Sequence, residues 1–356
     1  MKHITIGTRA SKLAMIQTYQ VIERLQQHWS NLQITIEQIR TTGDRVSDVP
    51  LAQIGGDGVF VTEIERALHE KRIDLAVHSL KDLPTTQPQG LRLMIMGPRE
   101  DVRDVLISNR QSWPAHGVLS PADGTKEIRS LEGSEDNAPL SGVPNGWEEK
   151  QQELRIGTCS LRRIAQLRVF CPGAQLLPIR GNVDTRLRKL EANEYDGIVL
   201  AAAGLHRLDL LERLVGRVSY LPIDMVMPAP GQGALAVEMR EEPEMIELLS
   251  PLNDRISQAT TSAERMFMRR LGAGCYLPVA AYGEISGETL TLRGLVISLD
   301  GKRQVRVQQS MHWTAGNILL DAERLGVKVA EQALEQGASE IIGALTSSRE
   351  QEQLHA

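Results

Sequence analysis

The chain has 356 residues, enough for roughly two or three domains with substantial cores. Its 41% hydrophobic and 24% charged residues and its net charge of −5 are ordinary for a soluble protein, and they argue against a broad nucleic-acid-binding surface. Three cysteines make no disulfide framework, and we find neither an apolar signal segment nor a run of about eighteen apolar residues, so we expect a cytoplasmic protein.

Polar side chains follow two strands predicted in the first part of the chain. The strand at 3–7 leads through Arg9 into a helix that Ser11 can cap. The short apolar strand at 74–77 leads into a polar turn with three candidate side chains, Ser79, Lys81 and Asp82. Open α/β sheets bind ligands at the carboxyl ends of their strands, so we expect these side chains to line a binding edge.

Two stretches have the composition of loops. Residues 55–58 precede a helix that contains Phe60, and they lack the lysine and hydroxyl of a phosphate-binding loop, which favours a mobile lid. Residues 109–153 are rich in Gly, Pro, Ser and acids and have little periodicity. They predict an exposed or disordered insertion that lies outside any ligand cleft.

Positive charge is concentrated in residues 155–190. Eight arginines and lysines against one aspartate give this stretch +7, so the rest of a chain that totals −5 carries −12. Two predicted strands, at 154–157 and 175–179, each run into a helix, and helix N-termini attract anions. The turns after these strands carry Thr158, Ser160 and Arg180. Both turns would open on the same edge of a parallel sheet.

The cations of this stretch allow two interpretations. Solvated helix surface is the simpler account of Arg168, Arg188 and Lys189. Four other arginines stand in turns or first helical turns, where positive charge opposes the positive helix end: Arg162, Arg163, Arg180 and Arg186. For these four we expect a bound anion as the missing partner. The planar guanidinium suits carboxylate or phosphate, and on the residues alone both remain open.

The last third of the chain changes character. A strand predicted at 234–238 can re-enter the first sheet, and a helix follows at 255–271. The exposed turn after that helix, Gly-Ala-Gly-Cys-Tyr, carries Cys275. Three strand-like segments within 279–309 and a helix at 317–336 then suggest a small third α+β domain.

Two residues are the leading candidates for chemistry. Asp82 could merely cap a turn, but beside a cationic cleft it could accept a substrate N–H bond and shuttle protons. The thiol of Cys275 lies on a flexible loop and is a candidate attachment point or nucleophile, whereas Cys159 and Cys171 are interpreted as small buried hydrophobes. The eight histidines show no metal-ligand spacing.

Seven motifs, in this order, resemble the hydroxymethylbilane synthase (porphobilinogen deaminase) family. They are IGTRASKLA, AVHSLKDLP, GTCSLRR, IRGNVDTRL, AAAGLHRL, PAPGQGALA and LGAGCYLP, and the match covers nearly the whole chain outside the insertion. The resemblance implies an α/β fold with two periplasmic-binding-protein-like lobes, each a doubly wound mixed sheet, and a small C-terminal α+β domain. It also implies a transferase that condenses four porphobilinogen molecules head to tail, releases ammonia at each step, and hydrolyses off hydroxymethylbilane.

The resemblance further implies roles for individual residues. Asp82 would be catalytic, and Cys275 would carry a dipyrromethane cofactor through a thioether. The cofactor would be held by Ser79, Lys81, Thr158, Ser160, Arg162 and Arg163. Substrate and growing chain would be held by Arg9, Ser11, Phe60, Arg180, Arg186 and Arg207. Each pyrrole ring carries an acetate and a propionate, and guanidinium–carboxylate bonds contribute about 1.5–3 kcal/mol each, so an arginine cluster suits such a polyanion.

The expected domains are a first lobe of residues 1–98 with 231–250, a second lobe of 99–230, and a C-terminal domain of 254–356. The resemblance implies a monomer that acts on a small molecule, with no metal and no nucleic-acid or membrane partner.

One departure from the family pattern supports an alternative. Gln53 and Asp57 stand in the lid where relatives often carry lysines, so lid closure through those charges is not expected. A carrier of small polycarboxylates with the same fold is favoured by the missing lysines and opposed by Cys275. A single-strand nucleic-acid binder would need aromatic platforms, and only 3% of residues are aromatic.

Overall fold

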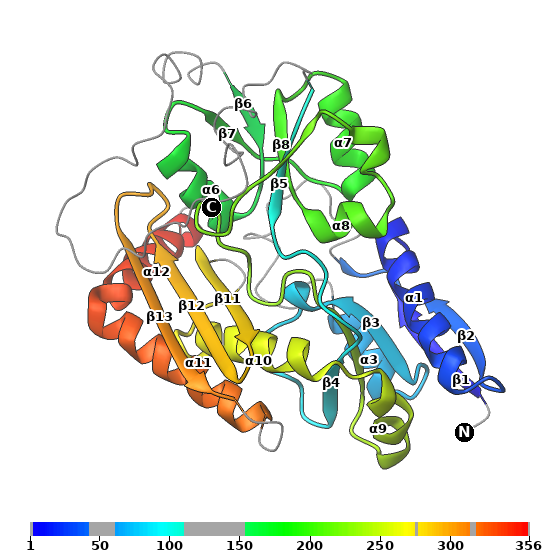
Figure 1. Cartoon of the computed structure of the whole chain (residues 1–356). Helices are drawn as coiled ribbons and strands as arrows, with labels where there is room; N and C mark the ends of the chain where they lie inside the picture. Colours follow the sequence, from blue (N-terminus) through cyan, green and yellow to red (C-terminus); the bar gives the residue numbers. More distant parts are fainter. Residues whose placement is uncertain (1–2, 43–60, 110–153, 275–276, 314–317, 355–356) are drawn as a thin grey trace.

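A computed structural model describes residues 3–42, 61–109, 154–274, 277–313 and 318–354. Two five-stranded sheets form two lobes, and a three-stranded sheet with its helices forms a third body beside them (Figure 1). The expected lid at 55–58, Phe60 and Cys275 lie outside the described residues, as does all of the predicted insertion except Asn109.

The first lobe is a mixed sheet in the order β2-β1-β3-β10-β4. Its strands are β1 (His3–Thr8), β2 (Gln33–Gln38), β3 (Leu75–Ser79), β4 (Leu91–Ile95) and β10 (Leu235–Arg240). β1 runs parallel to β2 and β3, whereas β10 lies antiparallel between β3 and β4. The prediction that residues 234–238 return to the first sheet is therefore confirmed. The lobe's helices are α1 (Lys12–His28), α3 (Thr62–His69) and α9 (Pro243–Leu249).

The second lobe repeats this plan in the order β7-β6-β8-β5-β9. Its strands are β5 (Asp104–Ser108), β6 (Arg155–Gly157), β7 (Gln175–Leu177), β8 (Gly197–Ala201) and β9 (Val218–Tyr220). β6 is parallel to β7 and β8, as expected, and β5 is antiparallel to β8 and β9. The helices are α6 (Leu161–Phe170), α7 (Val183–Glu191) and α8 (Ala202–Arg207). Both sheets are thus doubly wound and mixed.

In each sheet the fourth strand arrives from the other lobe. The chain crosses from β4 to β5 and returns from β9 to β10, and the two crossing segments lie side by side. Glu100 N–H donates to the Gly233 carbonyl (3.2 Å), and the Arg99 Nε–H donates to the Gln232 carbonyl (2.7 Å). Both crossings together form the hinge between the lobes.

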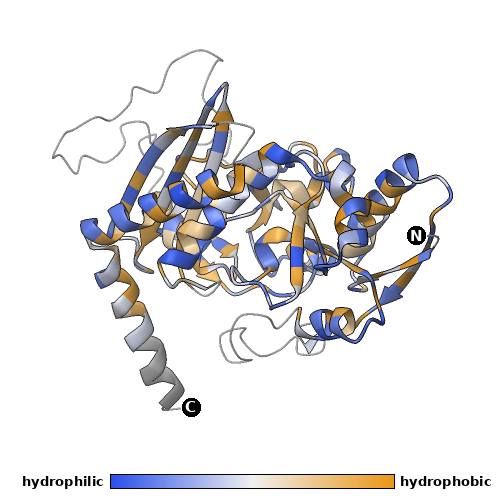
Figure 2. Ribbon diagram, turned by 90° about the horizontal axis from the view of Figure 1, so that it is seen from below, coloured by the Kyte–Doolittle hydropathy of each residue, from blue (hydrophilic) through white to orange (hydrophobic). Residues whose placement is uncertain are grey.

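The C-terminal domain packs its helices against one antiparallel sheet. Its elements are α10 (Arg255–Arg270), β11 (Val279–Ser286), β12 (Thr289–Ile297), β13 (Gln304–His312), α11 (Ile318–Ala333) and α12 (Ser339–Leu354). Phe267 of α10 is fully buried against β12, where a Cβ at Gly294 would approach the ring to 2.5 Å, so only glycine fits there. Figure 2 shows α12 leading away from the body of the molecule.

Several details differ from the sequence-based expectations. The strand β9 and the helices α9 and α12 were not predicted, and Gly337, at a φ of 93°, ends the predicted C-terminal helix with a kink before α12. The turn after α10 is not wholly exposed, because Ala273 and Gly274 are buried. In the described ranges, no helix combines the length and apolarity needed to span a bilayer.

Candidate active site

The polar turns predicted after the strands lie where expected. Ser79 is the last residue of β3, and Asp82 closes the short 3₁₀ turn Leu80–Asp82 that follows, with its side chain exposed. Thr158 is buried directly after β6, and Ser160 is the N-cap residue of α6. The site is therefore built at the carboxyl ends of strands from both lobes.

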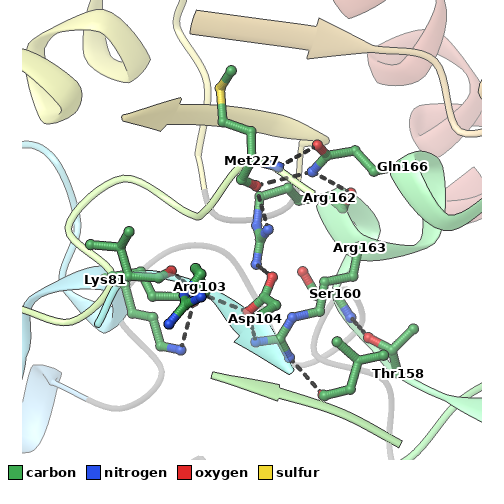
Figure 3. A network of polar contacts seen from close by, with 12 residues as sticks. Lys81, Arg103, Asp104, Thr158, Ser160, Arg162, Arg163, Gln166 and Met227 are labelled. Atoms are coloured by element: carbon green, nitrogen blue, oxygen red, sulfur yellow. Dashed lines mark hydrogen bonds and ion pairs between the residues drawn. The ribbon is translucent and has the colours of Figure 1, made fainter. Parts of the chain in front are cut away.

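Arg162 and Arg163 are buried and share one carboxylate, Asp104, at the start of β5 (Figure 3). Arg162 Nη2 lies 2.8 Å from Asp104 Oδ2, and Arg163 Nη2 lies 2.7 Å from Oδ1. Their other terminal nitrogens donate to the Met227 carbonyl (2.6 Å) and the Val199 carbonyl (3.0 Å). The expectation that both lack an anionic partner in the protein is therefore wrong.

Asp104 does not balance all the positive charge around it. Burial alone would raise its pKa, but Arg162, Arg163 and Lys81 together hold the pKa well below its usual range. Gln232 donates to Asp104 Oδ1 (2.8 Å) and accepts from Lys81 Nζ (3.2 Å), which ties the lysine to the same network. Three cations thus face one carboxylate. In addition, the Nε–H groups of Arg162 and Arg163 are buried without a hydrogen-bond partner in the described structure.

The surroundings of Lys81 change the pKa of its ammonium group. Burial, and then repulsion from Arg163, lower its pKa to about 8, although Asp82 and Asp104 act in the opposite direction. The shift therefore reports first the burial of the ammonium and second the neighbouring guanidinium groups, and perturbed lysines of this kind are common at functional sites.

Arg186, on α7, lies in the same electrostatic neighbourhood. Its pKa is lowered by burial and by Arg163 and Arg180, while Asp82 of the first lobe raises it. Its Nε–H donates to the Gly181 carbonyl (2.7 Å). Within the described ranges, no carboxylate lies within 4 Å of the guanidinium of Arg180 or Arg186. These two arginines keep donors for a ligand, and Asp82 lies near enough to Arg186 to affect its pKa.

The remaining predicted residues are more scattered. Ser11 caps α1 by accepting from Ala14 N–H (3.3 Å), and Ser79 accepts from Gln17 Nε2 (2.9 Å). Arg9 is half-buried in the turn after β1. Arg207 donates to the Gly233 carbonyl (2.8 Å), so it joins the hinge and reaches the Lys81 network only through the neighbouring residue Gln232.

Sequence reasoning missed two residues of the network. The signal that could have identified Asp104 is its position as an acid directly before an apolar strand. The signal for Gln232 is its position as a polar residue inside the PAPGQGALA motif. Cys159 and Cys171 are half-buried rather than fully buried. Over the ranges that the structure covers, no three His, Cys, Asp or Glu side chains are grouped to hold a metal ion.

Comparisons with known proteins agree with the seven motifs. The family model "Porphobilinogen deaminase, dipyromethane cofactor binding domain" matches residues 4–129 and 132–247, and the model of the C-terminal domain matches 259–335. Porphobilinogen deaminase from Syntrophotalea carbinolica is 41% identical over 343 residues, which are 96% of each chain. The enzyme from Geotalea daltonii is 39% identical over 356 residues, covering 99% of this chain and 98% of its own.

Among solved structures, the BenM effector-binding domain with benzoate aligns with 70% of this chain and 90% of its own, at 14% identity and a TM-score of 0.39. An ancestral arginine-binding protein bound to arginine aligns with 71% and 91%, at 10% identity and a TM-score of 0.36. The family models and the near-full-length relatives, by contrast, leave one conclusion: this chain belongs to the porphobilinogen deaminase family.

Proposed function

We propose that this chain condenses four porphobilinogen molecules into hydroxymethylbilane, as its family does, and that Asp82 is its acid–base residue. One observation carries the proposal: an exposed carboxylate on a turn of the first lobe lies near both Lys81 and Arg186 of the second lobe. Burial lowers the pKa of both cations, and the charge of Asp82 opposes that lowering. A substrate between the lobes would therefore meet a base on one side and carboxylate-binding cations on the other.

The charge balance of the site fits a dipyrromethane cofactor. Two pyrrole rings carry two acetates and two propionates, and the cluster of Lys81, Arg162 and Arg163 has one internal carboxylate for three cations. The unpartnered Nε–H groups of both arginines are donors for such an acid. We assign the cofactor to Cys275 as anchor and to these holding residues: Ser79, Lys81, Thr158, Ser160, Arg162 and Arg163.

When bound, the cofactor would supply the pyrrole carbon to which incoming units are joined. The carboxylate of Asp82 would accept a hydrogen bond from a pyrrole N–H. It would also take up the proton that is displaced when a carbon–carbon bond replaces the C–N bond to the departing ammonia. Its negative charge would also stabilise the cation that develops on porphobilinogen. Substrate carboxylates are assigned to Arg9, Ser11, Arg180, Arg186 and Arg207, and Phe60 is assigned a packing contact with a substrate ring.

Asp82→Asn tests the catalytic assignment. We expect ammonia release from porphobilinogen to fall by about 10²–10⁴, because the amide cannot take up the proton. The intact mass of the denatured variant should still exceed its sequence mass by the two-pyrrole adduct. Near-normal turnover would remove Asp82 from its role.

Cys275→Ser tests the anchor. The variant should have the mass of its sequence alone, and an adduct of unchanged mass would show attachment elsewhere. The same mass measurement on the unaltered chain separates an enzyme of this family from a carrier of polycarboxylates, which needs no adduct.

The domain bounds, oligomeric state and compartment are proposals of the same kind. Strand membership supports a first lobe of 1–98 with 231–250, a second of 99–230 and a C-terminal domain of 254–356. A cytoplasmic monomer with no nucleic-acid or membrane partner agrees with the composition of the chain. Light scattering of the purified protein would give the mass of the particle, and a dimer mass would correct the monomer.

A further inference from the structure

The turn that carries Asp82 is anchored on either side of the aspartate, because Leu80 and Leu83 are buried and Leu80 N–H donates to the Ala234 carbonyl (3.1 Å). It consists of one 3₁₀ turn, closed by a bond from Leu83 N–H to the Leu80 carbonyl (3.1 Å). Such single turns have poor hydrogen-bond geometry, so an exposed side chain on one depends on outside contacts for its placement. The contacts of the next two carbonyls, those of Leu83 and Pro84, therefore add to this anchoring and bear on where Asp82 stands.

Arg265, from helix α10 of the C-terminal domain, holds both of those carbonyls. Its Nη1 donates to the Leu83 carbonyl (3.2 Å) and its Nη2 to the Pro84 carbonyl (2.6 Å). The rigid fork of guanidinium fixes the spacing of two acceptors, which a lysine ammonium does not. One side chain thus clamps the backbone one and two residues after Asp82.

The clamp has a second contact on the far side of the turn. Hydrogen-bond complementarity turns the Gln87 amide oxygen towards Arg265 Nη2 (3.2 Å) and its nitrogen towards Glu238 Oε1 (3.2 Å). Glu238 lies on β10, fully buried, with its other oxygen 3.3 Å from His78 Nε2 of β3. Arg265 is thereby linked to the strand that ends in the Asp82 turn.

Helix α10 gives the clamp a fixed base. The preceding residue, Glu264, is fully buried and pairs through both oxygens with Arg99 of the hinge (2.6 and 2.9 Å). It also accepts from the N–H groups of Gly231 and Gly283 (2.7 Å each). Since Glu264 holds the helix against the hinge, the backbone from which the Arg265 side chain extends is fixed relative to the hinge.

We infer that Arg265 is a positioning residue for Asp82, an inference that rests on the proposed catalytic role of that aspartate. The C-terminal domain, through one guanidinium, sets where the carboxylate stands in the cleft. The same helix ends at Arg270, five residues before Cys275 in the chain, so it leads to the proposed anchor as well. A displacement of about 1 Å at reacting groups can cost on the order of 10²-fold in rate.

The test compares Arg265→Lys with Arg269→Lys, an exposed arginine on the same helix. We expect Arg265→Lys to keep the two-pyrrole adduct and a KM for porphobilinogen within about threefold, but to lose about 10–100-fold in kcat for ammonia release. Arg269→Lys should match the unaltered chain. The kcat is calculated per molecule that carries the adduct, so a smaller yield of folded protein does not lower it. Arg265→Gln, whose shorter side chain lacks the two-nitrogen fork of guanidinium, is the second variant if the lysine variant does not fold.

A double-mutant cycle separates positioning from a purely structural role. In an Asp82→Asn background, Arg265→Lys should slow the first porphobilinogen addition, followed by the mass of the enzyme, by less than twofold further. An equal further loss in that background, or a normal kcat for Arg265→Lys alone, overturns the inference and leaves the proposed function intact. An unaltered chain that releases no ammonia overturns the proposed function instead.

Discussion

The second lobe contains two pairs of arginines that the sequence makes look alike and the structure separates. Arg162 and Arg163 stand at the start of one helix, are almost fully buried, and share the carboxylate of Asp104. Arg180 and Arg186 stand around the start of the next helix, are half-buried, and have no carboxylate within 4 Å among the residues that the structure describes. The first pair has a partner inside the protein, and the second keeps its donors for the proposed substrate.

The difference in burial between the two pairs explains why only the first pair has a carboxylate partner in the protein. A buried guanidinium without a partner costs several kcal/mol, so the deep pair needs Asp104 before any ligand binds. Arg180 and Arg186 are only half-buried, so leaving them without a carboxylate before a ligand binds costs less. The two pairs are therefore alike in standing near a helix N-terminus. They differ in how deeply their guanidinium groups are buried and in whether an acid stands on a neighbouring strand.

The largest effect should follow from Asp104→Asn. Removing one partner of a buried ion pair costs about 3–5 kcal/mol, and here two guanidinium groups lose the same carboxylate. We expect the free energy of unfolding in urea to fall by at least that amount. The matched control is Glu191→Gln, since its 2.8 Å pair with Arg213 is exposed and should contribute about 0–1 kcal/mol. Equal losses in both variants would mean that burial does not distinguish these pairs.

Arg186→Gln should give the opposite pattern to Arg162→Gln. A bond from guanidinium to a substrate carboxylate contributes about 1.5–3 kcal/mol, so KM for porphobilinogen should rise about 10–150-fold. The free energy of unfolding should barely change, because Arg186 stands among like charges. Arg162→Gln should instead destabilise the fold, since it strips Asp104 of a partner. A KM unaffected by Arg186→Gln would contradict its assignment to the substrate.

The strand-end turns could be predicted because they depend on local pattern. Apolar strands followed by Ser79, Asp82 and Ser160 are visible in the sequence, and so is the return of β10 to the first sheet. The partner of Arg162 could not be found in this way, because Asp104 lies 58 residues earlier in the chain and meets it only through the antiparallel entry of β5. The Arg265 clamp joins residues 181 and 182 positions apart, which no local pattern records.

The titration of Lys81 should make the free energy of unfolding depend on pH. Its pKa in the folded protein is lowered to about 8, while the unfolded chain keeps the proton up to about pH 10.4. Between these values the unfolded state binds more protons, so the contribution of Lys81 to stability rises with pH from about 8 to 10. The measurement compares two proteins, the single variant Cys275→Ser and the double variant Cys275→Ser/Lys81→Gln. We expect the free energy of unfolding of the single variant, minus that of the double variant, to increase across that pH window. The cofactor-free background is needed because bound carboxylates would hold the proton on, and a flat difference would contradict the lowered pKa.

The smallest effect is expected from Arg188→Gln. This variant tests whether KM depends on where each positive charge stands or only on the total charge of the cleft. Arg188 is exposed on α7, two residues from Arg186, and donates to Thr185 Oγ1 (3.1 Å). Substitutions at such surface positions change the free energy of unfolding by about 0.5 kcal/mol or less, and KM should stay within about twofold. Exposed charges are screened over about 10 Å at 0.1 M salt. If Arg188→Gln raised KM as much as Arg186→Gln, and if added salt erased both effects, the cleft would attract carboxylates through its overall field and not through individual contacts.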